Sequence, residues 1–154
     1  MYERAHIESG LCYYEGMEYF TDHSFDIKKF KYWTLILNYD QYYLGRTICY
    51  LNTYKENISD LAREEYLELL EIIKAYQTTL TKLWQPDWWN YAQLGNVMPH
   101  LHFHFIPRYK DERIFEGTKF IDEQWGKNYT PTKERPKDEI LNEKIRLAIL
   151  GALE

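Results

Sequence analysis

The chain has 154 residues, of which 45% are hydrophobic and 28% charged, a composition that excludes a disordered or membrane-spanning chain and favours one globular domain. Its formal net charge of −5 argues against a broad basic face for nucleic acid, so a few local donors would have to hold any anionic ligand. The distant cysteines Cys12 and Cys49 form no zinc or disulfide pattern. Neither a signal peptide nor a bilayer-length apolar run is visible, so we expect a cytoplasmic protein without nucleic-acid or membrane partners.

The first part of the chain predicts a pair of strands after a weakly patterned start. Within residues 1–30 we expect at most a short helix near residues 5–10 and an edge strand that begins at residues 19–20. Residues 32–37 are rich in β-formers and precede a turn-prone segment, and residues 46–51 form a second run of the same kind. The two runs together predict an antiparallel pair.

The middle of the chain predicts a long helix followed by two strands. Residues 61–84 have apolar side chains at a period near 3.6, namely Leu61, Tyr66, Leu69, Leu70, Ile73, Tyr76, Leu80 and Leu83. Pro86 would end this helix, and residues 88–93 then have the composition of a strand. Residues 97–106 predict the next strand, which we expect to end at Pro107.

The C-terminal part predicts irregular structure and then a second helix. Residues 107–136 show no clear period and contain prolines near their end. Residues 138–153 have an amphipathic pattern that is typical of a helix. The order of elements predicts a single α+β domain over residues 1–154, with an antiparallel sheet and a core at about residues 30–130.

Three of the five histidines lie in one short window, at His100, His102 and His104. Successive side chains of a strand point to opposite faces, so the three imidazoles would line one face while Leu101, Phe103 and Phe105 point into the core. Three imidazoles on one face form a single chemical surface, which makes this window the candidate functional site.

Three interpretations suit this surface. The histidines could be solvent-facing polar residues of a half-buried strand, because strand periodicity requires polar side chains there. They could hold a metal, since imidazole is the commonest metal ligand, although three successive same-face positions converge poorly on one ion. They could also attack phosphorus, because neutral imidazole is a nucleophile near pH 7 and its neighbours can orient it or protonate a leaving group.

The residues around this window resemble those of the histidine triad (HIT) superfamily. Residues 100–106 match the family pattern, in which histidines alternate with apolar residues, at every position. Residues 94–99, 107–109 and 125–129 are similar to the bacterial and archaeal branch, and the chain resembles diadenosine polyphosphate hydrolases. The likeness extends from about residue 32 to residue 129.

The resemblance implies a role for each matching residue. His102 would be the nucleophile, His104 would contact the phosphate and assist the leaving group, and His100 would hold the others in the right tautomer. Asn38 would meet the nucleotide ribose, although asparagine at a strand end is also a common turn former. The other implied nucleotide or phosphate contacts are Asn90, Gln93, Gly95 and Asn96.

The resemblance also implies a fold, partners and cofactors. We expect an antiparallel sheet of about five strands with two main helices, paired into a two-fold homodimer. The expected ligand is a nucleotide substrate that contains adenosine, with no metal or cofactor bound by the protein and with any Mg²⁺ arriving on the substrate. Relatives often have a histidine after the second strand and zinc-ligating cysteines near the N-terminus. Residues 51–54 contain no histidine and Cys12 stands alone, so we infer that structural zinc is absent.

Two functions stay open at this point. In the first, a nucleotide hydrolase or transferase acts on the α-phosphate of nucleoside polyphosphates or phosphoramidates through a covalent nucleotidyl group on His102. In the second, a nucleotide-binding regulatory or scaffolding protein turns over little, since a fold and a motif do not by themselves establish catalysis. Arg46 and Arg108 could neutralise phosphate, but salt bridges are at least as good an explanation, so neither is placed in the catalytic set.

Overall fold

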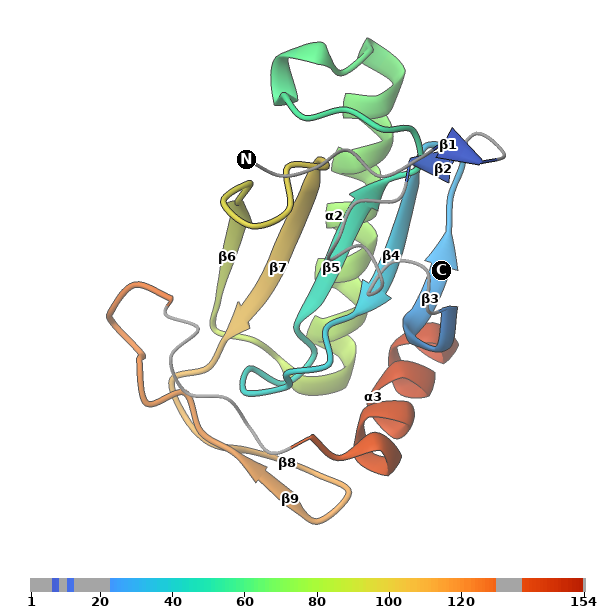
Figure 1. Cartoon of the computed structure of the whole chain (residues 1–154). Helices are drawn as coiled ribbons and strands as arrows, with labels where there is room; N and C mark the ends of the chain where they lie inside the picture. Colours follow the sequence, from blue (N-terminus) through green and yellow to red (C-terminus); the bar gives the residue numbers. More distant parts are fainter. Residues whose placement is uncertain (1–6, 9–10, 13–22, 130–136, 154) are drawn as a thin grey trace.

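A computed structural model describes residues 7–8, 11–12, 23–129 and 137–153 of the chain. Its centre is a five-stranded antiparallel sheet in the order β3-β4-β5-β7-β6 (Figure 1). The strands are β3 (Asp26–Lys29), β4 (Trp33–Leu37), β5 (Thr47–Leu51), β6 (Trp88–Gln93) and β7 (His102–Arg108). The predicted α+β class and the predicted antiparallel sheet are therefore confirmed.

Two helices pack on this sheet. The 3-10 helix η2 (Ile58–Asp60) precedes α2 (Arg63–Trp84), which runs behind the sheet in Figure 1. The second helix, α3 (Glu139–Ala152), packs on α2 and β3. Its N-cap, Asp138, accepts a hydrogen bond from the backbone N–H of Leu141 at 3.0 Å, which starts the helix where the sequence predicts it.

The predicted apolar stripe of α2 is confirmed at Leu69, Tyr76 and Leu80 and is wrong at Tyr66 and Leu70. Its buried side chains recur every three or four residues, as expected for a helix that faces a core: Glu65, Leu69, Ile72, Tyr76, Thr79, Leu80 and Trp84. Tyr66 and Leu70 are exposed, because each lies one residue round the helix from a buried position. Gly45 packs against this stripe with a φ of +85°, and an added Cβ would lie 2.7 Å from Leu80 Cδ2. Glycine therefore allows the turn before β5 to approach α2 closely.

The helix predicted near residues 5–10 is wrong in the part that the structure describes. Ile7–Glu8 forms strand β1, which pairs antiparallel with β2 (Leu11–Cys12). Pairing between these two short segments overrides a weak local helix signal. The edge strand expected at residues 19–20 lies outside the described residues, and the edge of the central sheet is β3, preceded by the 3-10 helix η1 (His23–Phe25).

Residues 107–136, predicted to be irregular, contain a hairpin. Strands β8 (Arg113–Phe115) and β9 (Thr118–Phe120) pair antiparallel around Glu116 and Gly117. Both turn residues have positive φ, 50° and 74°, as in the two-residue turns that match strand twist. Glutamate is an unusual first residue for such a turn, and each strand has 3 residues, so the sequence pattern was too short to reveal the hairpin.

Strand β7 differs from the predicted strand at both ends. It begins at His102 rather than residue 97, and it continues through Pro107 to Arg108. It pairs with β5 as far as Phe105, whereas its pairing with β6 extends to Arg108. Proline has no N–H to donate, and it is tolerated here because β7 has one paired neighbour at that level.

The two faces of the central sheet differ in character. The face toward α2 and α3 bears the main hydrophobic core. On the opposite face Ile36 and Ile48 form a small buried cluster, against which Phe25, Tyr50 and Met98 pack. The histidines of β7 share this second face, because the ladder places His104 opposite Ile48.

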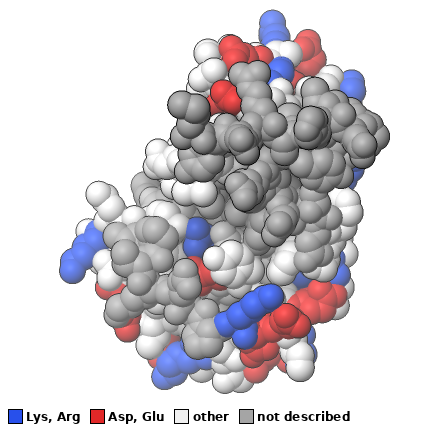
Figure 2. All heavy atoms as spheres, in the orientation of Figure 1, with Lys and Arg blue, Asp and Glu red and all other residues white. Residues whose placement is uncertain are grey.

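The surface of the described residues shows no strong separation of charge in the view of Figure 2. On the face seen in Figure 2, acidic and basic side chains are intermixed at both ends of the molecule. None of the helices in the described ranges is long and apolar enough to cross a membrane. The edge strand β6 exposes Trp88 and Tyr91, which are suited to pairing with a second copy, and the homodimer implied by the resemblance stays a prediction.

Candidate active site

Strand β7 carries two of the three histidines on one side of the sheet. The ladder places His102 opposite Tyr50 and His104 opposite Ile48 on β5. The His102 and His104 rings are 5.1 Å apart, centroid to centroid, at an angle of 73°. His100 precedes the strand, and its ring centroid lies 6.5 Å from that of Tyr50. The structure therefore brings the three imidazoles together, two by strand alternation and one by the loop before the strand.

His102 is held in one tautomer by a backbone carbonyl. Its Nδ1 lies 2.7 Å from the carbonyl oxygen of His100. A carbonyl oxygen accepts hydrogen bonds, so Nδ1 carries the proton and Nε2 keeps its lone pair. Burial lowers the pKa of His102, against a smaller opposing effect of this hydrogen bond. The arrangement keeps His102 neutral near pH 7, with a nucleophilic Nε2.

His100 is enclosed between β5 and the loop that follows it. It is 4% exposed, and its Nε2 donates to the carbonyl oxygen of Leu51 at 2.7 Å. The ring of Tyr54 stacks on it at 5.3 Å with an interplanar angle of 14°. Burial lowers the pKa of His100, while the hydrogen bond to Leu51 acts in the opposite direction. This histidine is therefore neutral and fixed in orientation.

His104 is half-buried and has the most perturbed imidazole of the three. Burial, the nearby Arg46 guanidinium and His102 together lower the pKa of His104 to about 3. Its Nδ1 is buried, and no described residue provides a hydrogen-bond partner for it. His104 is thus uncharged at neutral pH.

Two of the predicted nucleotide-binding asparagines lie at the histidine face. Asn38 follows Ile36 by two residues and is buried, and its Oδ1 accepts a hydrogen bond from the backbone N–H of Asp40 at 2.9 Å. It therefore acts as a turn former, and its contact with ribose stays a prediction. Asn90 pairs with Ile106 on β7, and its Oδ1 accepts a hydrogen bond from Arg108 at 2.7 Å.

The other three predicted contacts are placed differently. Gln93 lies opposite Phe103 in the ladder, so strand alternation puts it on the helix side of the sheet, away from the histidines. Gly95 and Asn96 are exposed in the connection between β6 and β7. Their contact with phosphate stays a prediction, whereas the register separates Gln93 from the histidine face.

Arg108 fastens the segment after β9 to the end of β7. It is buried, and its Nε and Nη2 lie 2.6 and 3.2 Å from the two carboxylate oxygens of Asp122. It also donates to the carbonyl oxygens of Gln124 and Lys127 and stacks over the ring of Tyr43 at 5.2 Å. Arg108 is therefore ion-paired in the interior rather than at the surface.

Arg46 forms a similar cluster next to His104. Its Nη1 lies 3.2 Å from Asp40 Oδ2, its Nη2 donates to the Tyr129 hydroxyl, and its guanidinium lies 5.0 Å from the centre of the Tyr129 ring. Arg46 is 5% exposed, and its Nε is buried with no hydrogen-bond partner among the described residues. It too is an ion-paired residue, and its positive charge acts on His104.

Sequence reasoning missed Tyr54 as part of the site. Within residues 51–54 the family resemblance concerns only the absence of a histidine. Tyr54 reaches His100 through the path of the loop after β5, which no local pattern predicts. The one clue in the sequence is that Tyr54 closely follows the strand predicted at residues 46–51. In the structure that strand, β5, pairs with the histidine strand β7.

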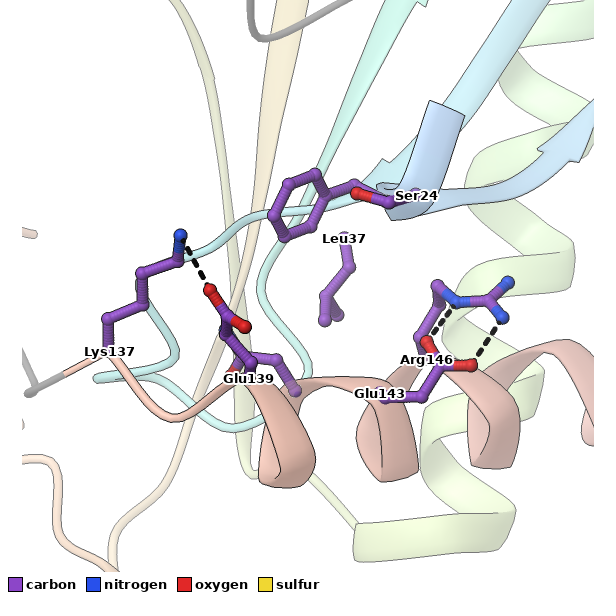
Figure 3. A pocket seen from close by; sticks show the side chains of 8 residues that line it. Ser24, Leu37, Lys137, Glu139, Glu143 and Arg146 are labelled. Atoms are coloured by element: carbon purple, nitrogen blue, oxygen red, sulfur yellow. Dashed lines mark hydrogen bonds and ion pairs between the residues drawn. The ribbon is translucent and has the colours of Figure 1, made fainter. Parts of the chain in front are cut away.

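A cavity of about 230 Å³ lies between η1 and the start of α3 (Figure 3). Its walls include Phe25, Leu37 and Asn142, and the Nδ2 of Asn142 donates to the carbonyl oxygen of Tyr39 at 2.8 Å. Its charged groups are paired with one another, as Arg146 is with Glu143. The cavity contains none of the triad histidines. In the described parts of the chain, no group of three His, Cys, Asp or Glu side chains is arranged to hold a metal.

The site is thus a five-stranded sheet that presents two buried, neutral histidines, His100 and His102, beside His104. The HIT domain family model matches residues 27–111, which is more than half of the chain. The chain therefore belongs to the HIT domain family. No curated protein matches the sequence.

Solved structures of histidine triad proteins share the fold. A protein from Sinorhizobium meliloti superposes with a TM-score of 0.69 at 18% identity, covering 83% of this chain and 88% of its own. One from Bradyrhizobium japonicum gives 0.65 at 20% identity, covering 84% and 90%. A hypothetical histidine triad nucleotide-binding protein from Sulfolobus tokodaii gives 0.56 at 22% identity, covering 82% and 84%. At these identities the likeness establishes the fold.

Proposed function

We propose that this protein is a nucleotide hydrolase or transferase in which His102 attacks the α-phosphate of the substrate. The observation that carries the proposal is the 2.7 Å hydrogen bond from His102 Nδ1 to the His100 carbonyl, which leaves the Nε2 lone pair for attack. Family membership and the name of the Sulfolobus tokodaii relative, a nucleotide-binding protein, support a nucleotide as the substrate.

The reaction would proceed in two displacements at phosphorus. A bond forms between Nε2 of His102 and the α-phosphorus, while the bond from phosphorus to the leaving oxygen or nitrogen breaks and the leaving group takes the electron pair. Water then attacks the same phosphorus, loses a proton and breaks the bond to Nε2. The nucleoside monophosphate leaves, and His102 returns to its neutral form.

The neighbouring residues would orient the substrate and stabilise charge. His104 would contact the phosphate, whose negative charge would raise the low pKa of this imidazole and allow it to protonate the leaving group. Asn38 would meet the ribose, and the amide of Asn90 with the Gly95–Asn96 backbone would contact phosphate oxygens. The protein would bind no cofactor of its own, and any Mg²⁺ would arrive with the substrate.

The candidate substrates are dinucleoside polyphosphates and nucleoside phosphoramidates that contain adenosine. The deciding experiment incubates the protein with diadenosine tetraphosphate and, separately, adenosine phosphoramidate, with and without a chelator. We expect wild-type protein to release AMP from at least one of them, and His102→Ala to lose more than about a thousand-fold of that turnover. His23→Ala, at an exposed histidine on η1, is the matched control and should retain full activity. Undiminished turnover by His102→Ala would overturn the proposal.

The alternative is a nucleotide-binding regulatory or scaffolding protein with little turnover. A covalent intermediate separates the two functions. Quenching the reaction with substrate labelled in the α-phosphate should trap label on wild-type protein but not on His102→Ala. AMP binding without either turnover or trapped label would favour the binding protein.

A further inference from the structure

The loop after β5 contacts the segment just before β7 at several positions. The backbone N–H of Leu51 donates to the carbonyl oxygen of Leu101 at 3.1 Å, and the N–H of Leu101 donates to the carbonyl oxygen of Lys55 at 2.7 Å. The ring of His100 adds its own 2.7 Å bond to the Leu51 carbonyl oxygen. Residues 51–55 therefore hold the backbone of residues 100–101 in place.

Tyr54 closes this loop over the imidazole of His100. The two rings are nearly parallel, at 14°, and their centroids are 5.3 Å apart. His100 is buried in this position at 4% exposure, so the bond from its Nε2 to Leu51 is shielded from water. The tyrosine hydroxyl points to the carboxylate of Glu56 on the same loop.

The loop is anchored at the start of α2. The Nζ of Lys55 lies 2.6 Å from Glu65 Oε2, and the same oxygen accepts a hydrogen bond from the backbone N–H of Ala62 at 2.7 Å. Glu65 is buried at 6% exposure, which is unusual for a carboxylate unless it is paired. The position of Tyr54 is thus fixed by contacts with both the sheet and the helix.

We propose that Tyr54 is a positioning residue: its stacking on His100 aims the His100 carbonyl at His102 Nδ1 and thereby keeps the His102 Nε2 lone pair available. The inference rests on the proposed function, in which Nε2 is the nucleophile. Tyr54 packs residues 51–55 against His100, and these residues bond the backbone at Leu101. Without the stack the loop would shift together with the adjoining His100 carbonyl, which would weaken the 2.7 Å bond to Nδ1. Without that bond His102 would also populate the tautomer whose Nε2 carries the proton, which cannot attack phosphorus.

The test compares Tyr54→Phe, Tyr54→Leu and Tyr54→Ala with wild type. Phenylalanine keeps the ring, so we expect kcat within about twofold of wild type, whereas leucine and alanine should each lower kcat roughly tenfold with KM changed less than threefold. Leucine fills most of the ring's volume, so it preserves the fold if alanine does not. Tyr91→Leu removes a tyrosine that the ladder places opposite Phe105, on the helix side of the sheet, and should leave kcat unchanged.

A second readout does not depend on turnover. Nitrogen chemical shifts of the imidazoles report the tautomer of His102, which should be the Nδ1–H form in wild type and Tyr54→Phe and a mixture in Tyr54→Leu. The acid limb of the kcat profile should shift to higher pH in Tyr54→Leu as water reaches the histidines. The nearby titratable groups, His104 on β7 and Tyr50 and Arg46 around β5, are the same in every variant.

Each result decides the inference separately from the proposed function. An unchanged His102 tautomer in Tyr54→Leu would overturn the positioning role, whatever the activity of the protein. A mixed tautomer in a protein that never turns over nucleotides would support the positioning role and contradict the proposed catalysis. A fall in kcat for Tyr54→Phe as large as for Tyr54→Leu would assign the effect to the hydroxyl rather than to stacking, and would also overturn the inference.

Discussion

Two neighbouring residues of β4 point into different environments. Leu35 belongs to the large cluster that the sheet forms with α2 and α3, whereas Ile36 belongs to the small cluster on the histidine side with Ile48. Both side chains are almost fully buried, at 0% and 1% exposure. The two side chains are equally buried but have different surroundings. Leu35 lies in a continuous apolar core, whereas Ile36 lies in a thin apolar layer beside polar groups.

The polar groups of the histidine side are buried with specific partners. His100 and His102 each bond to a backbone carbonyl oxygen, and Arg108 is paired with Asp122. Burying a polar group without a partner costs more free energy than one hydrogen bond contributes. The stability of this face therefore depends on individual polar contacts. The helix side stabilises the fold through its large buried apolar area and its close packing. That stability allows neutral imidazoles to be buried on the histidine side.

The largest expected effect tests this difference on β4 itself. Leu35→Ala should lower the free energy of unfolding by about 4 kcal/mol, because it leaves a cavity in a tightly packed core, and Ile36→Ala should lower it by about 2 kcal/mol, because the thin layer can collapse or admit water. Urea denaturation followed by circular dichroism measures both. Equal losses would show that the two faces contribute alike to stability.

The next effect concerns the buried ion pair at the end of β7. Asp122→Asn removes the charge opposite Arg108 and leaves the guanidinium buried, so we expect a loss of about 3 kcal/mol. The matched control is Glu112→Gln, which breaks the solvent-exposed pair with Lys119 and should change stability by less than about 0.5 kcal/mol. A small loss for Asp122→Asn would mean that water reaches Arg108 and that this face is less dry than its burial indicates.

The parts of the fold that the sequence predicted are those with a strong local period. Residues 88–93 were predicted as a strand and form β6, and the two predicted helices are α2 and α3. The alternation of histidine with Leu101, Phe103 and Phe105 also predicted correctly which side faces the core, since these three pack in the main cluster. Period and composition are properties of one segment, so they can be read without knowing its neighbours.

The parts that escaped prediction depend on other segments. Pro107 remains in β7 because the strand has one paired neighbour there, and Gln93 faces away from the histidines because of its register with Phe103. Tyr54 reaches the site through its contact with His100, far along the chain, and the loop that carries it is fixed by the ion pair of Lys55 with Glu65 on α2. Register and loop paths are settled by tertiary pairing, and no single segment contains that information.

The smallest effect is the pH dependence that the histidine side should impose on stability. His100, His102 and His104 all have lowered pKa values in the folded protein, chiefly because of burial. Below about pH 6.5 the unfolded chain therefore binds protons that the folded chain does not, and the free energy of unfolding falls as the pH falls. The stabilising contribution is fully present above pH 6.5 and, for His104, continues to be lost until the pH approaches about 3.

Urea unfolding at pH 7.5, 6.5 and 5.5 measures this loss, which should reach about 1 kcal/mol at pH 5.5 for His104 alone. Glu65 and Glu143 have lowered pKa values, so their contribution to stability is lost only below about pH 4.5, outside this range. His104→Gln should remove its share of the slope. An unchanged slope in His104→Gln would mean that water or ions reach His104 freely, and the contrast between a dry histidine side and a packed helix side would then fail at the residue where it is expected to be strongest.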